Sequence, residues 1–226
     1  MMTLFPKSRS SRLRVTLLAM VAMSLLLWNC GWAVAAKVTY QPVEGDVLFQ
    51  SLPSGPGLDV IDAIEGSTEC PFSHCGVVVK KNGEWFVLEA MVPTVQEVPY
   101  GRWIQRGKGR FAAYRLKEAR RLMIPAWIKE MRNQMGLPYD FRYRMSDEEI
   151  YCSELPFDAW KKLTGENMGK VVKLGDLKWE KYRKVIQEIE GTTEIPLERE
   201  MITPRDLAGA EQLELVLENG LSQGGK

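Results

Sequence analysis

The sequence has very little histidine, no phosphate-binding motif and almost no excess of one charge over the other. His74 is the single histidine among 226 residues, so any imidazole chemistry depends on it. No glycine-rich phosphate loop, internal repeat or low-complexity segment is present. The 30 basic and 29 acidic side chains nearly balance, and no basic patch of the kind that binds nucleic acid is evident. These absences argue against a phosphate-loop protein and against a nucleic-acid partner.

Long apolar runs are also scarce, and the main one lies within residues 1–36. There the basic sequence KSRSSRLR precedes an apolar run (15–28), and the small residues of AVAA follow. This order predicts a secretory signal peptide and export to the periplasm or cell envelope. An uncleaved membrane anchor and a lipidated Cys30 remain alternatives, although NCG interrupts the run before the roughly 20 apolar residues that a bilayer span needs. Cleavage would leave 26 basic against 29 acidic side chains.

Four cysteines are present, and cleavage near residue 36 would leave three of them, Cys70, Cys75 and Cys152. Export favours disulfides where geometry allows, but an odd number leaves at least one free thiol. The sequence CPFSHC also resembles a zinc-binding spacing. However, His74 and Cys75 are adjacent in an expected strand, and adjacent strand residues point to opposite faces. We therefore expect no metal ion or other cofactor, and interpret Cys75 as a buried thiol on the face away from His74.

Residues 37–226 are expected to form a single domain of the α+β class. Met123, Trp127, Met131 and Met135 recur every four residues, which predicts the core-facing side of a helix. Periodicity and turn residues together predict these elements: a strand in EGDVLFQS (44–51), a helix in LDVIDAIEG (58–66), at least one strand within TVQEVPYGRWI (94–104) and GRFAAYRL (109–116), helices in RLMIPAWIKEMRNQMG (121–136) and CSELPFDAWKKLTG (152–165), and a mainly helical part from about 177.

A β-hairpin is the clearest local feature of the sequence. HCGVVVK and EWFVLEA flank Asn82-Gly83, a pair typical of two-residue hairpin turns. In such a turn the numbers of facing residues sum to 165, so Gly76 faces Glu89. Glu89 then lies on the same face as His74, one diagonal step away, within reach of long side chains. Gly76 is expected to leave the space between them open.

Cys152 and His74 form a candidate nucleophile and base. A cysteine at a helix N-terminus has its thiolate favoured by the unpaired N–H groups and the helix dipole. A nearby imidazole can take the thiol proton and later give it to a leaving group. A carboxylate at Glu89 can accept a hydrogen bond from the imidazole and fix its tautomer. Taken singly, each residue has a plainer interpretation, as a core thiol, a structural histidine or a solvated strand acid.

The order of these motifs makes the interpretation more specific. GDVLF, SHCGVVV, the Asn-Gly turn, VLEA and finally YCSEL opening a helix resemble the permuted branch of the NlpC-like, papain-fold cysteine amidases, the YiiX/YaeF type, over residues 44–165. The resemblance implies a circularly permuted papain-like fold, with an antiparallel sheet packed against helices. It also implies Cys152 as nucleophile, His74 as base and acid, and Glu89 as the orienting residue. GLPY further implies that Tyr139 lines the substrate site.

The resemblance leads to an exported cysteine amidase or peptidase-like hydrolase that acts through an acyl-Cys152 intermediate. Its substrate would be a peptide, an aminoacylated molecule or a lipid amide. Acyl transfer from a lipid donor, as in lecithin:retinol acyltransferase-like proteins, is an alternative. A groove that binds a peptide or acyl chain without turnover is another. Membrane association through the N-terminal segment would follow if that segment is retained.

Overall fold

The computed structural model describes residues 40–55, 59–146 and 148–221. The expected signal peptide (1–36) lies outside the described residues. Among the described helices, none is long and apolar enough to cross a membrane. In chain order the helices and strands are β1 (Val47–Gln50), α2 (Val60–Thr68), β2 (His74–Lys81), β3 (Glu84–Met91), β4 (Thr94–Pro99), α3 (Tyr100–Arg106), β5 (Phe111–Leu116), α4 (Ile124–Arg132), α5 (Glu154–Thr164), β6 (Val172–Lys173), α6 (Arg183–Glu190), β7 (Glu200–Met201), α7 (Pro204–Ala208) and β8 (Leu213–Asn219).

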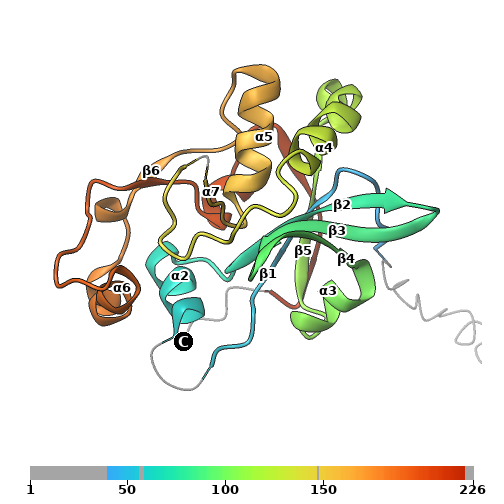
Figure 1. Ribbon diagram of the computed structural model, residues 1–226. Helices are drawn as coiled ribbons and strands as arrows, with labels where there is room; N and C mark the ends of the chain where they lie inside the picture. Colours follow the sequence, from blue (N-terminus) through green and yellow to red (C-terminus); the bar gives the residue numbers. More distant parts are fainter. Residues whose placement is uncertain (1–39, 56–58, 147, 222–226) are drawn as a thin grey trace, which may run out of the picture. The chain divides into compact units, whose positions relative to one another are not determined.

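The domain is built on an antiparallel sheet in the order β4-β3-β2-β1-β5-β8, with β6 and β7 paired separately. Helices α4 and α5 lie on one side of this sheet and α3 on the other (Figure 1). Strands β1 and β2 are therefore covered on both faces, and alternate residues enter two different cores. Val77 enters the core beneath α4 and α5, whereas Val78 packs in the core with Trp103 of α3. This arrangement confirms the predicted α+β class.

The β2–β3 hairpin has the predicted register. Val77 lies opposite Leu88, a pair whose numbers sum to 165. Asn82 and Gly83 have φ values of 51° and 86°, the left-handed conformation that a type I′ turn requires at both central positions. Because a shift of one residue would turn every side chain to the other face, this turn decides which residues of β3 face α3.

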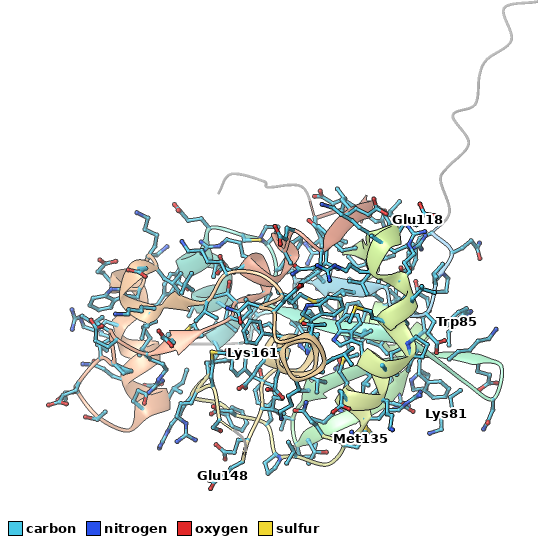
Figure 2. The ribbon with its side chains drawn as sticks, turned by 90° about the horizontal axis from the view of Figure 1, so that it is seen from above. Lys81, Trp85, Glu118, Met135, Glu148 and Lys161 are labelled. Carbon is cyan, nitrogen blue, oxygen red and sulfur yellow. The ribbon has the colours of Figure 1, made fainter. Side chains whose placement is uncertain are left out.

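Helices α4 and α5 form the predicted core-facing pair. Trp127 donates a hydrogen bond to the carbonyl of Pro156 (2.9 Å), and its ring meets Trp160 edge-on. Met131 is also fully buried, but Met135 lies beyond the last turn of α4 and is 45% exposed (Figure 2). Helix α5 ends at Gly165 with φ 76°, as its C-cap pattern predicts. The two helices thus present one apolar surface to the sheet.

The expectation of at least one strand within 94–104 and 109–116 is confirmed by β4 and β5. Within 94–104 the strand ends at Pro99, which cannot donate to a ladder, and Tyr100 then begins α3, on which Trp103 is fully buried. One expectation about secondary structure was wrong. The part of the chain after 177 is not mainly helical. It contains α6 and α7 but ends in β8, where LELVLEN pairs with β5 and extends the sheet.

Candidate active site

Cys152 lies two residues before the first residue of α5. Ser153 is the N-cap of the helix, and its hydroxyl donates to the carbonyl of Ile202 (2.8 Å), which fixes this end of α5. Pro156 falls within the first turn, where its missing N–H costs nothing, as the sequence predicts. The Cys152 side chain is only 3% exposed. The helix therefore places a nearly buried thiol at its positively polarised end.

His74, the first residue of β2, meets Glu89 of β3. The distance from His74 Nε2 to Glu89 Oε2 is 2.7 Å, and both side chains are buried. The diagonal contact predicted from the hairpin register is thus present. The space above Gly76 is not open, however. A Cβ atom there would lie 2.5 Å from Val87 Cγ1, so glycine is required for close packing.

Helix α3 supplies two further neighbours that the sequence did not reveal. Arg106 Nη2 lies 2.7 and 2.5 Å from the two carboxylate oxygens of Glu89. The ring of Trp103 packs beside the imidazole of His74, with centroids 6.1 Å apart. Arginine and tryptophan three positions apart on a short, uncapped helix give no local signal of a site. Only the packing of α3 against the sheet brings them there.

Cys75 is a fully buried thiol in the core beneath α4 and α5, as expected, and it also contacts Cys152, which the sequence did not predict. Its thiol and its backbone N–H both donate hydrogen bonds toward the Cys152 sulfur. His74 is the first residue of β2, and Cys152 lies at this end of the strand, so side chains from both faces reach it. Cys70, Cys75 and Cys152 are all free thiols.

The electrostatics favour a charged pair. The hydrogen bond from Cys75 lowers the pKa of Cys152 well below its ordinary value. Burial alone would raise this pKa, and His74 lowers it further. Burial would lower the pKa of His74, but hydrogen bonds to Cys152 and Glu89 outweigh it and raise that pKa to about 9. Burial would raise the pKa of Glu89, yet His74 and Arg106 hold it below its ordinary value. The stable arrangement is a thiolate, an imidazolium and a carboxylate in a row.

Tyr139, expected to line the substrate site, lies near Cys152 and hydrogen-bonds Tyr143. Tyr143 in turn packs edge-on against Tyr151, with ring centroids 5.5 Å apart. Tyr143 and Tyr151 line the pocket beside Cys152, and Tyr139 is not among its lining residues. Tyr143 has φ 54°, which is uncommon for an aromatic residue, and the aromatic-rich loop PYDFRYR was its only sequence signal. A substrate contact at Tyr139 stays a prediction.

The pocket at Cys152 is predominantly apolar. Its empty space, with the open solvent at the mouth included, is about 780 Å³. Helices α2 and α6 provide much of the wall, and Cys152 lies in the wall with Tyr143 and Tyr151. The aliphatic lining residues are Val60, Ala63, Ile64, Leu174, Leu177, Val185, Ile186, Ile189 and Ile202.

Comparisons with known proteins agree with this geometry. The profile of the family described as permuted papain-like amidase enzyme, YaeF/YiiX, matches residues 41–217. The uncharacterized protein YiiX of Escherichia coli strain K12 is 30% identical over 181 residues, which are 78% of this chain and 87% of the relative. The crystal structure of the metalloprotein yiiX from Escherichia coli O157:H7 is 29% identical, with a TM-score of 0.72. It covers 80% of this chain and 99% of its own.

The protein in that crystal structure is described as a metalloprotein, so the donor set of this chain bears on the comparison. Within residues 40–55, 59–146 and 148–221, no group of three or more histidine, cysteine, aspartate or glutamate side chains is arranged to hold a metal ion. Glu89 already directs both carboxylate oxygens to Arg106 and His74.

The match over residues 41–217, the shared fold and the relative at 30% identity together place the chain in the permuted papain-like amidase family of the YaeF/YiiX type, a family of cysteine peptidase-like hydrolases.

Proposed function

We propose that this amidase cleaves its substrate through an acyl-enzyme on Cys152, with His74 as proton carrier and Glu89 as its orienting partner. The observation that carries the proposal is the row of Cys152, His74 and Glu89 in a buried site, with a 2.7 Å contact between the last two. Hydrogen bonding of this kind keeps a thiolate and an imidazolium ready before substrate arrives.

In the first half of the reaction, the Cys152 thiolate attacks the carbonyl carbon of the amide and forms a C–S bond. His74, as the imidazolium, gives its proton to the amide nitrogen, and the C–N bond breaks to release an amine. In the second half, neutral His74 takes a proton from water as the water oxygen attacks the thioester. The C–S bond then breaks, a carboxylic acid leaves, and the thiolate–imidazolium pair is restored.

The test is detection of the acyl-enzyme. Wild-type protein and the Cys152→Ala variant are mixed with a set of p-nitroanilides, quenched in acid and measured by intact mass. We expect release of p-nitroaniline together with a mass increase of one acyl group that peptide mapping assigns to Cys152. No adduct in the variant is the matched control. Adduct formation on Cys70 or Cys75 with unchanged turnover in Cys152→Ala would contradict the proposal.

The apolar pocket favours one of the substrate classes, the lipid amides. A long acyl chain would lie in the pocket against the aliphatic residues of α2 and α6, with its carbonyl carbon at Cys152. Each buried CH₂ group contributes about 0.8 kcal/mol, so chain length should have a steep effect on the specificity constant. A peptide amide with polar side chains would gain much less from this wall.

Chain length and pocket shape can be varied against each other. Acetyl, octanoyl and palmitoyl p-nitroanilides, with a dipeptide p-nitroanilide, differ in the acyl group alone. We expect kcat/KM to rise along the acyl series, and Ile186→Trp to suppress the palmitoyl substrate while the acetyl substrate is little affected. Leu122→Trp, at a surface position 95% exposed, is the matched control. A preference for the dipeptide would favour a peptide substrate, and transfer of the acyl group to an added alcohol would indicate an acyltransferase.

Export to the periplasm or cell envelope is also a proposal, supported by the sequence of residues 1–36 alone. N-terminal sequencing of protein from its native host is the test. A mature chain that begins near Ala36 or Lys37 would support cleavage. Retention of KSRSSRLR would favour a membrane anchor, and a lipid on Cys30 would favour a lipoprotein.

A further inference from the structure

We propose that Arg106 is a positioning residue of this site, whose guanidinium divides the charge of the Glu89 carboxylate between itself and His74. The inference rests on the proposed function, because it concerns how the proton carrier is held. Neither the sequence pattern nor the resemblance to known amidases assigns a role to Arg106.

The contacts of Glu89 carry the argument. Its side chain is fully buried, and both oxygens face Arg106 Nη2, at 2.7 and 2.5 Å. The oxygen at 2.5 Å is also the one that lies 2.7 Å from His74 Nε2. One carboxylate oxygen is therefore shared between two cations when His74 is protonated. Without Arg106, a fully buried carboxylate would have a single charged partner.

Helix α3 is placed to perform this function. Trp103 and Arg106 are three positions apart, so both face the sheet from one side of the helix. Trp103 packs beside the His74 ring while Arg106 reaches the carboxylate that the ring contacts. Arg106 is in the last turn, where a cation is favoured by the helix dipole, and its side chain is 26% exposed. The cation thus stands at the solvent side of an otherwise buried row of charges.

The shared carboxylate determines the direction of the effect. Arg106 is a positive charge close to Cys152 and His74, so its removal favours the protonated forms of both while Glu89 stays ionised beside the His74 imidazolium. Both the loss of the Cys152 proton and the later loss of the His74 proton should then require a higher pH. The other titratable groups near Cys152 include Cys75 and the tyrosines 139, 143 and 151. Burial raises the pKa of each of these, so they stay neutral over the same range. Burial also raises the pKa of Glu154 to about 8, but its carboxylate accepts from the backbone N–H groups of Ser146 and Tyr151, so its titration should be common to wild type and Arg106→Met.

The experiment measures the rate of Cys152 alkylation by iodoacetamide against pH, with peptide mapping to separate Cys152 from the other thiols. This profile reports the thiolate and its imidazole partner without any substrate. In Arg106→Met we expect the inflections of Cys152 and His74 both to move upward by about one pH unit. The shift is modest because Arg106 contacts Glu89 and does not contact the two titrating groups directly. Arg106→Lys should restore the wild-type profile, because a single nitrogen makes both contacts and an ammonium can replace it.

Arg115→Met is the matched control. Arg115 makes a similarly short contact with a buried carboxylate, Asp46, at 2.6 Å, and is 23% exposed. Asp46 directly precedes the first residue of β1, whereas His74 pairs with Gln50, the last residue of that strand. Asp46 therefore lies at the other end of β1 from His74. This variant should lose stability without moving either inflection. An unchanged profile in folded Arg106→Met, or an equal shift in Arg115→Met, would overturn the inference alone. A wild-type profile with an ordinary thiol pKa would overturn the proposed nucleophile and this inference together.

Discussion

Replacement of Glu89 by glutamine removes one charge from the site and almost no volume. An amide oxygen can still accept from His74, but the amide NH₂ group must then face Arg106, donor against donor. The His74 imidazolium loses a fully buried counter-charge at 2.7 Å. The pKa of His74, now raised to about 9, should fall as a result.

The size of the effect follows from the loss of a close, opposite charge, which changes a pKa by about one to three pH units. That corresponds to about 1.4–4 kcal/mol of lost imidazolium stabilisation, or a rate of acyl-enzyme formation lower by roughly 10- to 1,000-fold. Glu89→Ala should be slower still, because the hydrogen bond is lost as well as the charge. The alkaline inflection of the rate should move downward, opposite to the shift expected for Arg106→Met.

A double-mutant cycle on acyl-enzyme formation tests whether Glu89 acts through His74. In a His74→Ala background, Glu89→Gln should add little, because residues that act as one unit are strongly non-additive. Asp46→Asn is the control for loss of a buried, arginine-paired carboxylate, and should cost stability without changing the rate profile. Full additivity would mean that Glu89 contacts substrate or serves only the fold. A wild-type rate in Glu89→Gln would mean that another group orients His74.

Three further outcomes are expected. His74→Ala should abolish turnover while lowering the free energy of unfolding by only about 1 kcal/mol, measured by urea unfolding; near-normal turnover would remove the thiol–imidazole mechanism. Cys75→Ala should raise the pH needed to form the Cys152 thiolate in the alkylation profile. Cys75→Ser keeps a hydrogen-bond donor and should partly restore the wild-type profile. No change in Cys75→Ala would exclude a role for that hydrogen bond. Between pH 6.5 and about 9 the folded Cys152–His74 pair holds one proton, as does the unfolded pair, so this pair should leave stability flat. The free energy of unfolding should therefore have the same pH dependence in this window in wild type and in a Cys152→Ala/His74→Ala double variant, where neither group can titrate; a difference in slope would contradict the one-proton pair.

Local sequence determined the parts of the site that depend on short-range geometry. The Asn82-Gly83 turn sets a two-residue hairpin, and the period of two along a strand then assigns Glu89 to the face of His74. Likewise, Gly165 and an early proline bracket the helix that follows Cys152. These features rest on backbone conformations and hydrogen bonds within a few residues of each other, so the sequence alone predicts them.

Contacts between distant elements were decided only by the tertiary structure. Arg106 reaches Glu89 because α3 packs beneath the sheet, and nothing near Arg106 in the sequence marks it. Cys75 meets Cys152 because α5 begins at the end of β2, which strand alternation cannot anticipate. The apolar pocket arises where α2 and α6, more than a hundred residues apart, contribute to one wall. Periodicity identifies the face of an element that will be buried, but the partner of that face depends on how the whole chain packs.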